Sequence, residues 1–412
     1  MDINENLDVI VIGGGPAGSA TALFLSAKGY RVLLLEQAFF PRDKVCGEFI
    51  SPAADDLLAE LGVLESIVAL SPQRLSGVAI SAYGEDELHI DYPDLAGQKM
   101  TSLSLPRTTL DALLLDAVER RGVKVLQGHK VTDLILQDEQ VIGVEGRDGQ
   151  KNSFTFQAKV VVDAGGRNCI SLRRLGLKQE NRAQRKIALA AHWSGVELRE
   201  PYCFMHISRP GYTGMAPVGP GQMNVILVVD QHLITGKNAD EFYRRTVLNN
   251  PLRRKLLLNA TIAEKVRMVE SLAYSVKPPA CGGLLLVGDA TGFMDPFTGE
   301  GIFLSLKSAQ LAAGVIEGAF ADGDFSFAGL SQYESLRRKE FRKKFLLSKI
   351  LQEMIYRPSL ARWMVRTLRK NSALAQELVG VIGDYVPADK VVSPTYLAHF
   401  LLAGWRATPA RK

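Results

Sequence analysis

The chain has 412 residues, of which 47% are hydrophobic and 23% charged, a composition that excludes extensive disorder and predicts a folded protein of two domains. The formal net charge of +5 is small and collects in one late stretch, so it does not indicate a nucleic-acid partner. Four widely spaced cysteines without a CxxC pair, and six histidines without an HExxH motif, favour neither a metal site nor a disulfide framework.

The N-terminal segment, MDINENLD, is acidic and polar, and it does not have the character of a signal peptide. No apolar run reaches the roughly 18 to 20 residues that a membrane-spanning helix needs. We therefore expect a cytoplasmic protein that does not cross the membrane.

The chain opens with the pattern of a βαβ unit. Residues 7–12 form a continuous apolar run, as a buried parallel strand does, and 31–36 form a second one. The segment between them predicts a helix over about 16–29 that ends at a glycine.

The turn after the first strand reads GGGPAG and places Gly13, Gly15 and Gly18 in G-x-G-x-x-G spacing. A strand before this motif and a helix after it are the context in which it binds a dinucleotide, with phosphates at the helix N-terminus. Glu36 ends the second strand, where an acid accepts ribose hydroxyls. A glycine-rich turn that binds nothing is the alternative. The expected cofactor-binding residues of this unit are Gly13, Gly15, Pro16, Ala17, Gly18 and Glu36.

The middle of the chain predicts helices at 51–70 and 107–121, and between them antiparallel strands at 76–91. Short strands follow the second helix, at 123–127, 130–136, 141–147, 154–157 and 159–163. From 187 to 274, strand-like pieces surround a helix-rich segment at 238–258, which is typical of an antiparallel sheet with helices on one side.

A buried strand returns at 284–289 and feeds a long helix from about 302, and the residues after 325 read as helices. Buried strands at both ends of this region indicate a discontinuous domain. We predict an α/β fold with a discontinuous Rossmann-type nucleotide domain, an antiparallel-sheet substrate domain and a helical C-terminal region. The expected segments are 1–75, 107–185 and 275–324 for the first, 76–106 and 186–274 for the second, and 325–412 for the third.

The segment 284–302, LLLVGDATGFMDPFTGEGI, forms the second motif. Asp289 is placed to accept hydrogen bonds from a polyol. The TGEG turn at 298–301 presents backbone N–H groups at a helix start, which stabilise negative charge on a cofactor ring. An ordinary strand–loop–helix with a capping Asp is the alternative. The expected cofactor-binding residues here are Gly288, Asp289, Pro296, Gly299, Gly301 and Ile302.

Over residues 7–330, these motifs and their order resemble the FAD-dependent oxidoreductase superfamily of geranylgeranyl reductases, aromatic-ring hydroxylases and flavin-dependent halogenases. The resemblance implies FAD as cofactor. The segment 40–52, FPRDKVCGEFISP, is similar to a loop that in geranylgeranyl reductases and halogenases carries an Arg facing the adenosine phosphates and a Cys-Gly-Glu beside the flavin ring. This assigns Arg42 to cofactor binding, and Cys46 and Glu48 to catalysis. A buried thiol and a turn-stabilising carboxylate are the alternatives for the last two.

The same resemblance assigns Arg107 and Val131 to FAD binding. The segment 160–176 is similar to the DAxGRxxxLxxxLG stretch of halogenase-like members, although Gly165-Gly166 stand where hydroxylases usually have Asp-Gly. GYTGMAP at 211–217 aligns with the aromatic stretch of geranylgeranyl reductases and lacks two of its rings, which leaves Tyr212 and Pro217 as the expected substrate residues.

Three chemistries follow from this resemblance. Halogenation is disfavoured, because Lys99 is the only lysine between Leu70 and Met100 and GYTGMAP has no tryptophan. The sequence favours monooxygenation of an apolar aromatic or polyketide-like small molecule, and C=C reduction of an isoprenoid chain comes second. A flavin-binding protein without catalytic activity is the alternative from another class. Electrons come either from NAD(P)H as a transient reductant or from a flavin-reducing partner.

The tail carries a strongly basic segment, RRKEFRKKFLLSK at 337–349, with seven basic residues against one Glu. Apolar residues follow at helical spacing, so a helix over 337–355 could lie on a membrane surface as a peripheral contact. A solvated basic face, with the apolar side packed on the substrate domain, is the favoured interpretation.

Overall fold

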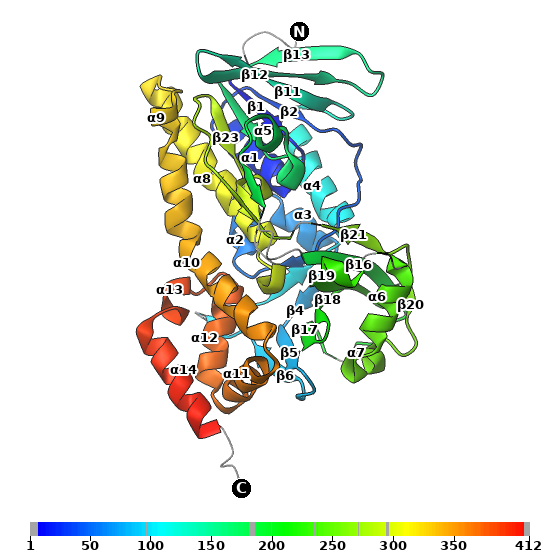
Figure 1. Cartoon of the computed structure of the whole chain (residues 1–412). Helices are drawn as coiled ribbons and strands as arrows, with labels where there is room; N and C mark the ends of the chain where they lie inside the picture. The colour runs from blue at the N-terminus through cyan, green and yellow to red at the C-terminus, as the bar shows by residue number, and fades with distance from the viewer. Residues whose placement is uncertain are drawn as a thin grey trace.

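The computed structural model describes residues 7–95, 97–180, 186–198, 200–234, 236, 238–270, 272–293 and 296–407. A five-stranded parallel sheet forms the centre of the upper part of the molecule in Figure 1. Its order is β10 (Lys124–Leu126), β2 (Val32–Leu35), β1 (Val9–Ile12), β14 (Val160–Asp163) and β23 (Leu284–Leu286). The expectation that the first strand and the strand near 284 share one sheet is confirmed.

Three helices pack on this sheet: α1 (Pro16–Ala27), α4 (Arg107–Arg120) and α8 (Gly301–Asp322). The four residues of β1 are all buried, because the helices cover one face and another apolar cluster covers the other. That second cluster includes residues of a three-stranded antiparallel sheet of β11 (Lys130–Gln137), β12 (Gln140–Arg147) and β13 (Ser153–Gln157), together with α5 (Ile170–Arg174).

The lower part of the molecule contains a larger, mainly antiparallel sheet. Its order is β20 (Thr261–Ile262), β16 (Lys186–Ser194), β19 (Gln222–Asp230), β18 (Gly211–Gly219), β17 (Tyr202–Ser208), β5 (Gly77–Ala82) and β6 (Leu88–Asp91), and β21 (Arg267–Val269) also pairs with β16. Among the described strands of this sheet, β17 and β5 form the parallel pair, and the other neighbouring strands are antiparallel. One face packs against α6 (Ala239–Leu248) and α7 (Pro251–Leu256).

Short elements connect the two sheets. A three-stranded sheet of β3 (Phe49–Ile50), β9 (Ser102–Ser104) and β4 (Gln73–Leu75) lies beside α2 (Ala54–Glu60) and α3 (Leu64–Ala69). The single helix expected at 51–70 is therefore two helices, because Gly62 takes a φ of +72° between them. A second small sheet contains β15 (Lys178–Glu180), β22 (Tyr274–Val276) and β24 (Gly292–Phe293), and β7 (Asp94–Leu95) pairs with β8 (Gln98–Lys99).

The C-terminal region is helical, as expected, and covers the other face of the large sheet (Figure 1). It consists of α9 (Phe327–Leu330), α10 (Gln332–Ile355), α11 (Pro358–Lys370), α12 (Ser372–Ile382), α13 (Ala388–Val391) and α14 (Pro394–Ala407). The apolar side of α10 is buried through Phe341, Leu347, Leu351 and Ile355. No helix in the described ranges is both long and apolar enough to cross a membrane.

Candidate functional site

The glycine turn between β1 and α1 depends on two very close contacts. Gly13 has a φ of +97°, and a Cβ placed there would lie 2.9 Å from the Ala164 carbonyl oxygen. A Cβ on Gly18 would lie 1.8 Å from the carbonyl oxygen of Gly13, so helix and strand approach closely only without a side chain. Gly15 differs, because a Cβ there would lie 3.4 Å from Nη2 of Arg42 and 4.0 Å from Nη2 of Arg107. Its surroundings are two guanidinium groups rather than backbone.

Glu36 follows β2 and is held beside this turn. Its carboxylate accepts hydrogen bonds from the backbone N–H groups of Gly14 and Ala38, both at 2.8 Å, and lies 3.8 Å from Nη2 of Arg42. The carboxylate is nearly buried and keeps acceptor capacity for ribose hydroxyls.

Arg107 and Arg42 approach the same buried carboxylate. Arg107 donates two hydrogen bonds of 2.7 Å to Asp111, and Nη1 of Arg42 lies 3.2 Å from Asp111. Burial acts to lower the pKa of Arg107, but Asp111 and Cys46 together outweigh it and the pKa is raised. The Arg107 guanidinium therefore stays charged beside Gly15.

The second motif meets the first at the end of β23. Gly288 has a φ of +60°, and a Cβ there would lie 2.8 Å from Cβ of Ala17. Burial raises the pKa of Asp289, whereas Arg167, Lys44 and Arg107 oppose this shift. The backbone carbonyl of Asp289 accepts a hydrogen bond of 2.5 Å from the Tyr274 hydroxyl.

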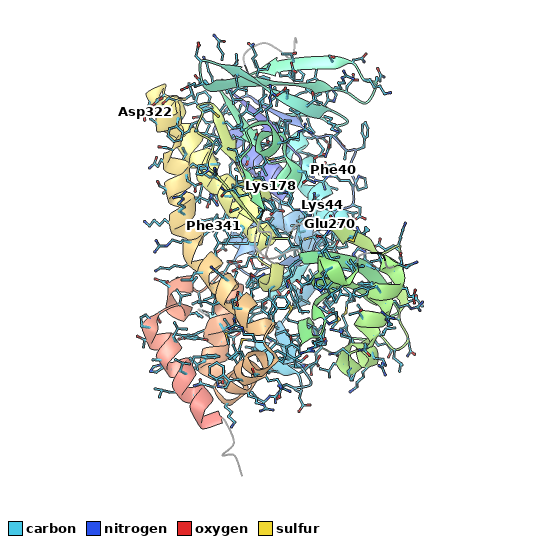
Figure 2. The ribbon with its side chains drawn as sticks, viewed as in Figure 1. Phe40, Lys44, Lys178, Glu270, Asp322 and Phe341 are labelled. Atoms are coloured by element: carbon cyan, nitrogen blue, oxygen red, sulfur yellow. The ribbon has the colours of Figure 1, made fainter. Side chains whose placement is uncertain are left out.

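Lys44 completes a cluster of four cations with Arg42, Arg107 and Arg167. Although the Lys44 side chain is exposed, partial loss of hydration and then repulsion from Arg167 lower its pKa. Figure 2 shows Lys44 between the two sheets, with Glu270 labelled nearby, and the Glu270 carbonyl accepts a hydrogen bond from Arg167.

This donor set fits FAD. The cation cluster suits the two phosphates, Glu36 suits a ribose, and Asp289 suits the ribityl chain. Among the described residues, no group of three or more His, Cys, Asp or Glu is arranged to hold a metal ion.

The TGEG turn lies where α8 begins, beside β3 and α10. Gly299 has a φ of +74°, and a Cβ there would lie 2.9 Å from the ring of Phe49. Glu300 accepts a hydrogen bond from Thr298 and lies 3.5 Å from Lys344 of α10, which also pairs with Asp384. The C-terminal helices therefore help to position this turn.

The remaining expected cofactor residues lie around these motifs. Ile302 is buried in the first turn of α8, and Pro296 begins a short 3-10 helix over Pro296–Thr298. Val131 packs in the cluster that also holds Ile12 and Leu35, at the ends of β1 and β2. Met294 and Asp295 of the motif lie outside the described residues.

The Cys46–Glu48 loop connects the nucleotide-binding part to the large sheet. The Cys46 carbonyl accepts a hydrogen bond of 2.7 Å from the Asn224 side chain on β19, and Sγ of Cys46 accepts a weak one of 3.4 Å from the Glu48 backbone. The Glu48 side chain is buried, and its Oε1 accepts a hydrogen bond of 2.9 Å from the backbone N–H of Arg107. Glu48 directly precedes Phe49, whose ring contacts the TGEG turn.

The other oxygen of Glu48 begins a chain of polar groups that the sequence did not predict. Oε2 of Glu48 lies 2.7 Å from Nε2 of His192 on β16, and Nδ1 of His192 lies 2.7 Å from Glu264. Glu264 pairs with Arg267 at 2.5 Å, and Arg267 also pairs with Asp43. Hydrogen bonding to Glu48 raises the pKa of His192, and Glu264 adds to this effect. We name Glu48, His192 and Glu264 the proton chain.

The register of the large sheet shows which residues share the face with His192. Ala216, Asn224 and His192 form one cross-strand row, and Gly214, Ile226 and Ala190 form another. Tyr212, Val228 and Ala188 form a third row. On this face of β16, His192 follows Ala188 and Ala190 in alternation, and a polar residue after these small apolar ones was the sequence signal that could have revealed it.

The two expected substrate residues lie on opposite faces of β18. The Tyr212 ring stands edge-on to Phe297, near the TGEG turn, with centroids 5.2 Å apart. Pro217 pairs with Met223 and shares the face of Met215, under α6 and α7. The structure therefore brings Tyr212, but not Pro217, to the face that carries the proton chain.

Comparison with known proteins gives a consistent result. A family model described as an FAD binding domain matches residues 6–345. A tryptophan 2-halogenase of Chondromyces crocatus is 28% identical over 81% of the chain, which spans 65% of that relative's length. A menaquinone reductase of Mycolicibacterium smegmatis is 26% identical over 93% of both chains. The solved structure of a flavin-dependent brominase superposes with a TM-score of 0.82, at 22% identity, over 97% of this chain and 98% of that one.

The family model covers most of the chain, including both glycine-rich motifs. Halogenases and reductases among the relatives make the chain an enzyme of the oxidoreductase class. The protein belongs to the FAD binding domain family and is an FAD-dependent oxidoreductase.

Proposed function

We propose that the protein reduces a C=C bond of an apolar, isoprenoid-type molecule. The observation that carries this proposal is the proton chain, which runs from the partly exposed Glu264 through His192 to the buried Glu48. Reduction of a double bond needs one hydride and one proton. Bound FAD, once reduced, supplies the hydride equivalent with its two electrons.

The residues of the chain supply the proton. Because hydrogen bonding to Glu48 raises the pKa of His192, the protonated imidazole is favoured, and in that form it donates to both carboxylates. The proton that reaches the substrate carbon passes from His192 through Glu48, and water recharges His192 by way of Glu264. A charged imidazolium favours this donor role over the role of a base.

The apolar rows of the large sheet support an apolar substrate. Small side chains at Gly214, Ala190 and Ala188 lie next to Tyr212 on the face of the proton chain. The menaquinone reductase, which matches along 93% of both chains, also supports a reductase.

Monooxygenation of an aromatic or polyketide-like ring, which the sequence favoured, is the second candidate. A Cβ on Gly214 would lie 3.8 Å from Cε of Met205 and touch nothing closer, so this row is compatible with a ring beside it. We rank it second because a hydroxylase acting on a phenol uses a base, whereas the proton chain is charged with a proton.

The halogenase relatives do not lead us to propose halogenation. Lys99, the only lysine from 71 to 99, lies on the β7–β8 hairpin, and β18 carries no tryptophan. The lysine and the tryptophans expected of a halogenase are therefore missing from the corresponding segments.

Anaerobic single turnover tests the proposal. The FAD-loaded protein is reduced with one equivalent of dithionite, so that neither NAD(P)H nor a reducing partner is required, and is then mixed with a prenylated lipid that carries no quinone ring. We expect the flavin to reoxidise without oxygen while the product gains two hydrogens. Two results together would favour monooxygenation instead: the flavin reoxidises only with oxygen, and the product carries an oxygen atom from labelled O₂.

A further inference from the structure

The last described helix, α14, has two apolar sides. Its inner side is buried through Tyr396 and Phe400, and the Phe400 ring packs edge-on against Trp363 of α11 at 5.1 Å. Its outer side exposes Leu397 by 40%, Leu401 by 62% and Leu402 by 56%. Three exposed leucines within six residues, on a helix already anchored by its other side, form an apolar strip on the surface. We name these three leucines the outer strip.

The region that carries the outer strip is strongly basic. Residues 325–412 contain 16 Lys and Arg and 6 Asp and Glu, which gives a net charge of +10. The rest of the chain contains 33 basic and 38 acidic residues, which gives −5. The mild overall charge of +5 therefore conceals two regions of opposite sign.

Several exposed basic side chains lie on the helices that contact α14. Lys390 belongs to α13, and Arg362 directly precedes Trp363 on α11. Lys343 of α10 reaches α13 through an ion pair with Asp389 at 3.3 Å. One turn after Lys343, Leu346 is exposed by 48%.

We propose that α14 docks the protein on the surface of an anionic lipid bilayer, with the outer strip in the interface and the surrounding cations at the headgroups. An amphipathic helix with apolar residues on one side and basic residues around it binds such a surface. A second copy of the chain is disfavoured as the occupant, because two regions of +10 would repel each other.

The position of α14 relates this surface to the proposed chemistry. Tyr396 and Phe400 belong to the same apolar cluster as Tyr212 and Phe297. The helical region therefore contacts the bilayer on its outside and the face of the large sheet on its inside. The proposed docking is independent of which candidate reaction the protein catalyses, because it depends on α14 and not on the flavin chemistry.

Co-sedimentation of the full-length, FAD-loaded protein with vesicles tests the docking. The vesicles contain phosphatidylcholine alone or phosphatidylcholine with phosphatidylglycerol. We expect binding only to the anionic vesicles, weakened by added salt. Leu401→Glu with Leu402→Glu should reduce the bound fraction at least about tenfold, because two leucines are withdrawn from the interface.

Leu258→Glu is the matched control, because Leu258 is exposed by 73% on the other side of the large sheet, after α7. This variant should bind vesicles like the wild type, and thermal unfolding should show all variants folded. Equal binding by the double variant overturns the proposal. A second result would also overturn it: light scattering shows that the wild type is a dimer and the double variant a monomer, and the wild type does not bind anionic vesicles. Turnover of a detergent-dispersed substrate reports separately on the proposed reduction.

Discussion

The glycine turn around Gly13–Gly18 and the inner face of the large sheet show two ways of making a site. At the turn, backbone approaches backbone so closely that only glycine fits, and the cations around it are part of recognisable motifs. On the sheet face, ordinary residues from distant segments meet, such as Glu48 and His192, which are 144 residues apart. The residues of the first kind of site lie close together in the sequence, whereas those of the second are brought together only by the register of the strands.

The largest expected effect tests the backbone contact in the turn. Gly18→Ala places a Cβ 1.8 Å from the Gly13 carbonyl oxygen and should lower the free energy of unfolding by about 3 kcal/mol. Urea unfolding of the purified protein measures this. Gly314→Ala, in the interior of α8 with no atom within 4 Å of the added Cβ, is the control and should be neutral or stabilising by up to about 1 kcal/mol. Equal midpoints for both variants would contradict the close packing.

Gly15→Val should separate cofactor binding from folding. The new side chain meets the guanidinium groups of Arg42 and Arg107 rather than backbone, so the protein should fold while FAD affinity falls at least about tenfold. Flavin fluorescence during FAD titration measures the affinity, and circular dichroism checks the fold. A variant that keeps full FAD content would show that the phosphates do not lie against Gly15.

On the sheet face, the largest expected effect is on turnover. His192→Gln keeps a side chain that can hydrogen-bond but cannot carry a proton between the carboxylates, so single-turnover reduction should slow by about 100-fold. FAD content should change little, and circular dichroism should show the variant folded, although it loses the ion pairs to Glu48 and Glu264. An unchanged rate would remove His192 from the chemistry.

Some residues of the candidate site could be assigned from the sequence, and others could not. The glycine spacing, Glu36 and Asp289 could be assigned because the motifs that contain them are contiguous, and Arg107 was assigned from the family resemblance. Asn224 and His192 could not, because their meeting with the Cys46–Glu48 loop depends on the register of β16 and β19. Pro217 was assigned together with Tyr212 because GYTGMAP resembles the aromatic stretch of geranylgeranyl reductases, although five residues along a strand place the two on opposite faces.

A smaller effect is expected on the pH profile. The raised pKa of His192 keeps its proton above the ordinary value of 6.5, so turnover should fall as pH rises through this raised pKa. Below pH 6.5 the ion pairs of His192 contribute fully to the stability of the fold. This contribution is lost as the pH rises through the raised pKa of His192. Glu264→Gln removes one carboxylate and should move the fall in turnover down by about one pH unit. A profile that does not move would exclude Glu264 from the proton chain.

The smallest effect is expected at Cys46. Its thiol accepts a weak hydrogen bond from the Glu48 backbone and interacts with the Arg107 guanidinium, and its carbonyl accepts a shorter hydrogen bond from Asn224. Cys46→Ser should therefore change the turnover rate by less than about threefold. A loss as large as that of His192→Gln would make the thiol, rather than the proton chain, the proton donor.

Stopped-flow mixing of the dithionite-reduced protein with a prenylated lipid that carries no quinone ring, under anaerobic conditions, tests the central claim most directly. The flavin absorbance should return in wild type, about 100-fold more slowly in His192→Gln, and one double bond of the substrate should be saturated. If the absorbance stays bleached until oxygen is admitted, and the rate is the same in both proteins, the proton chain does not serve a reduction and the proposed function is wrong.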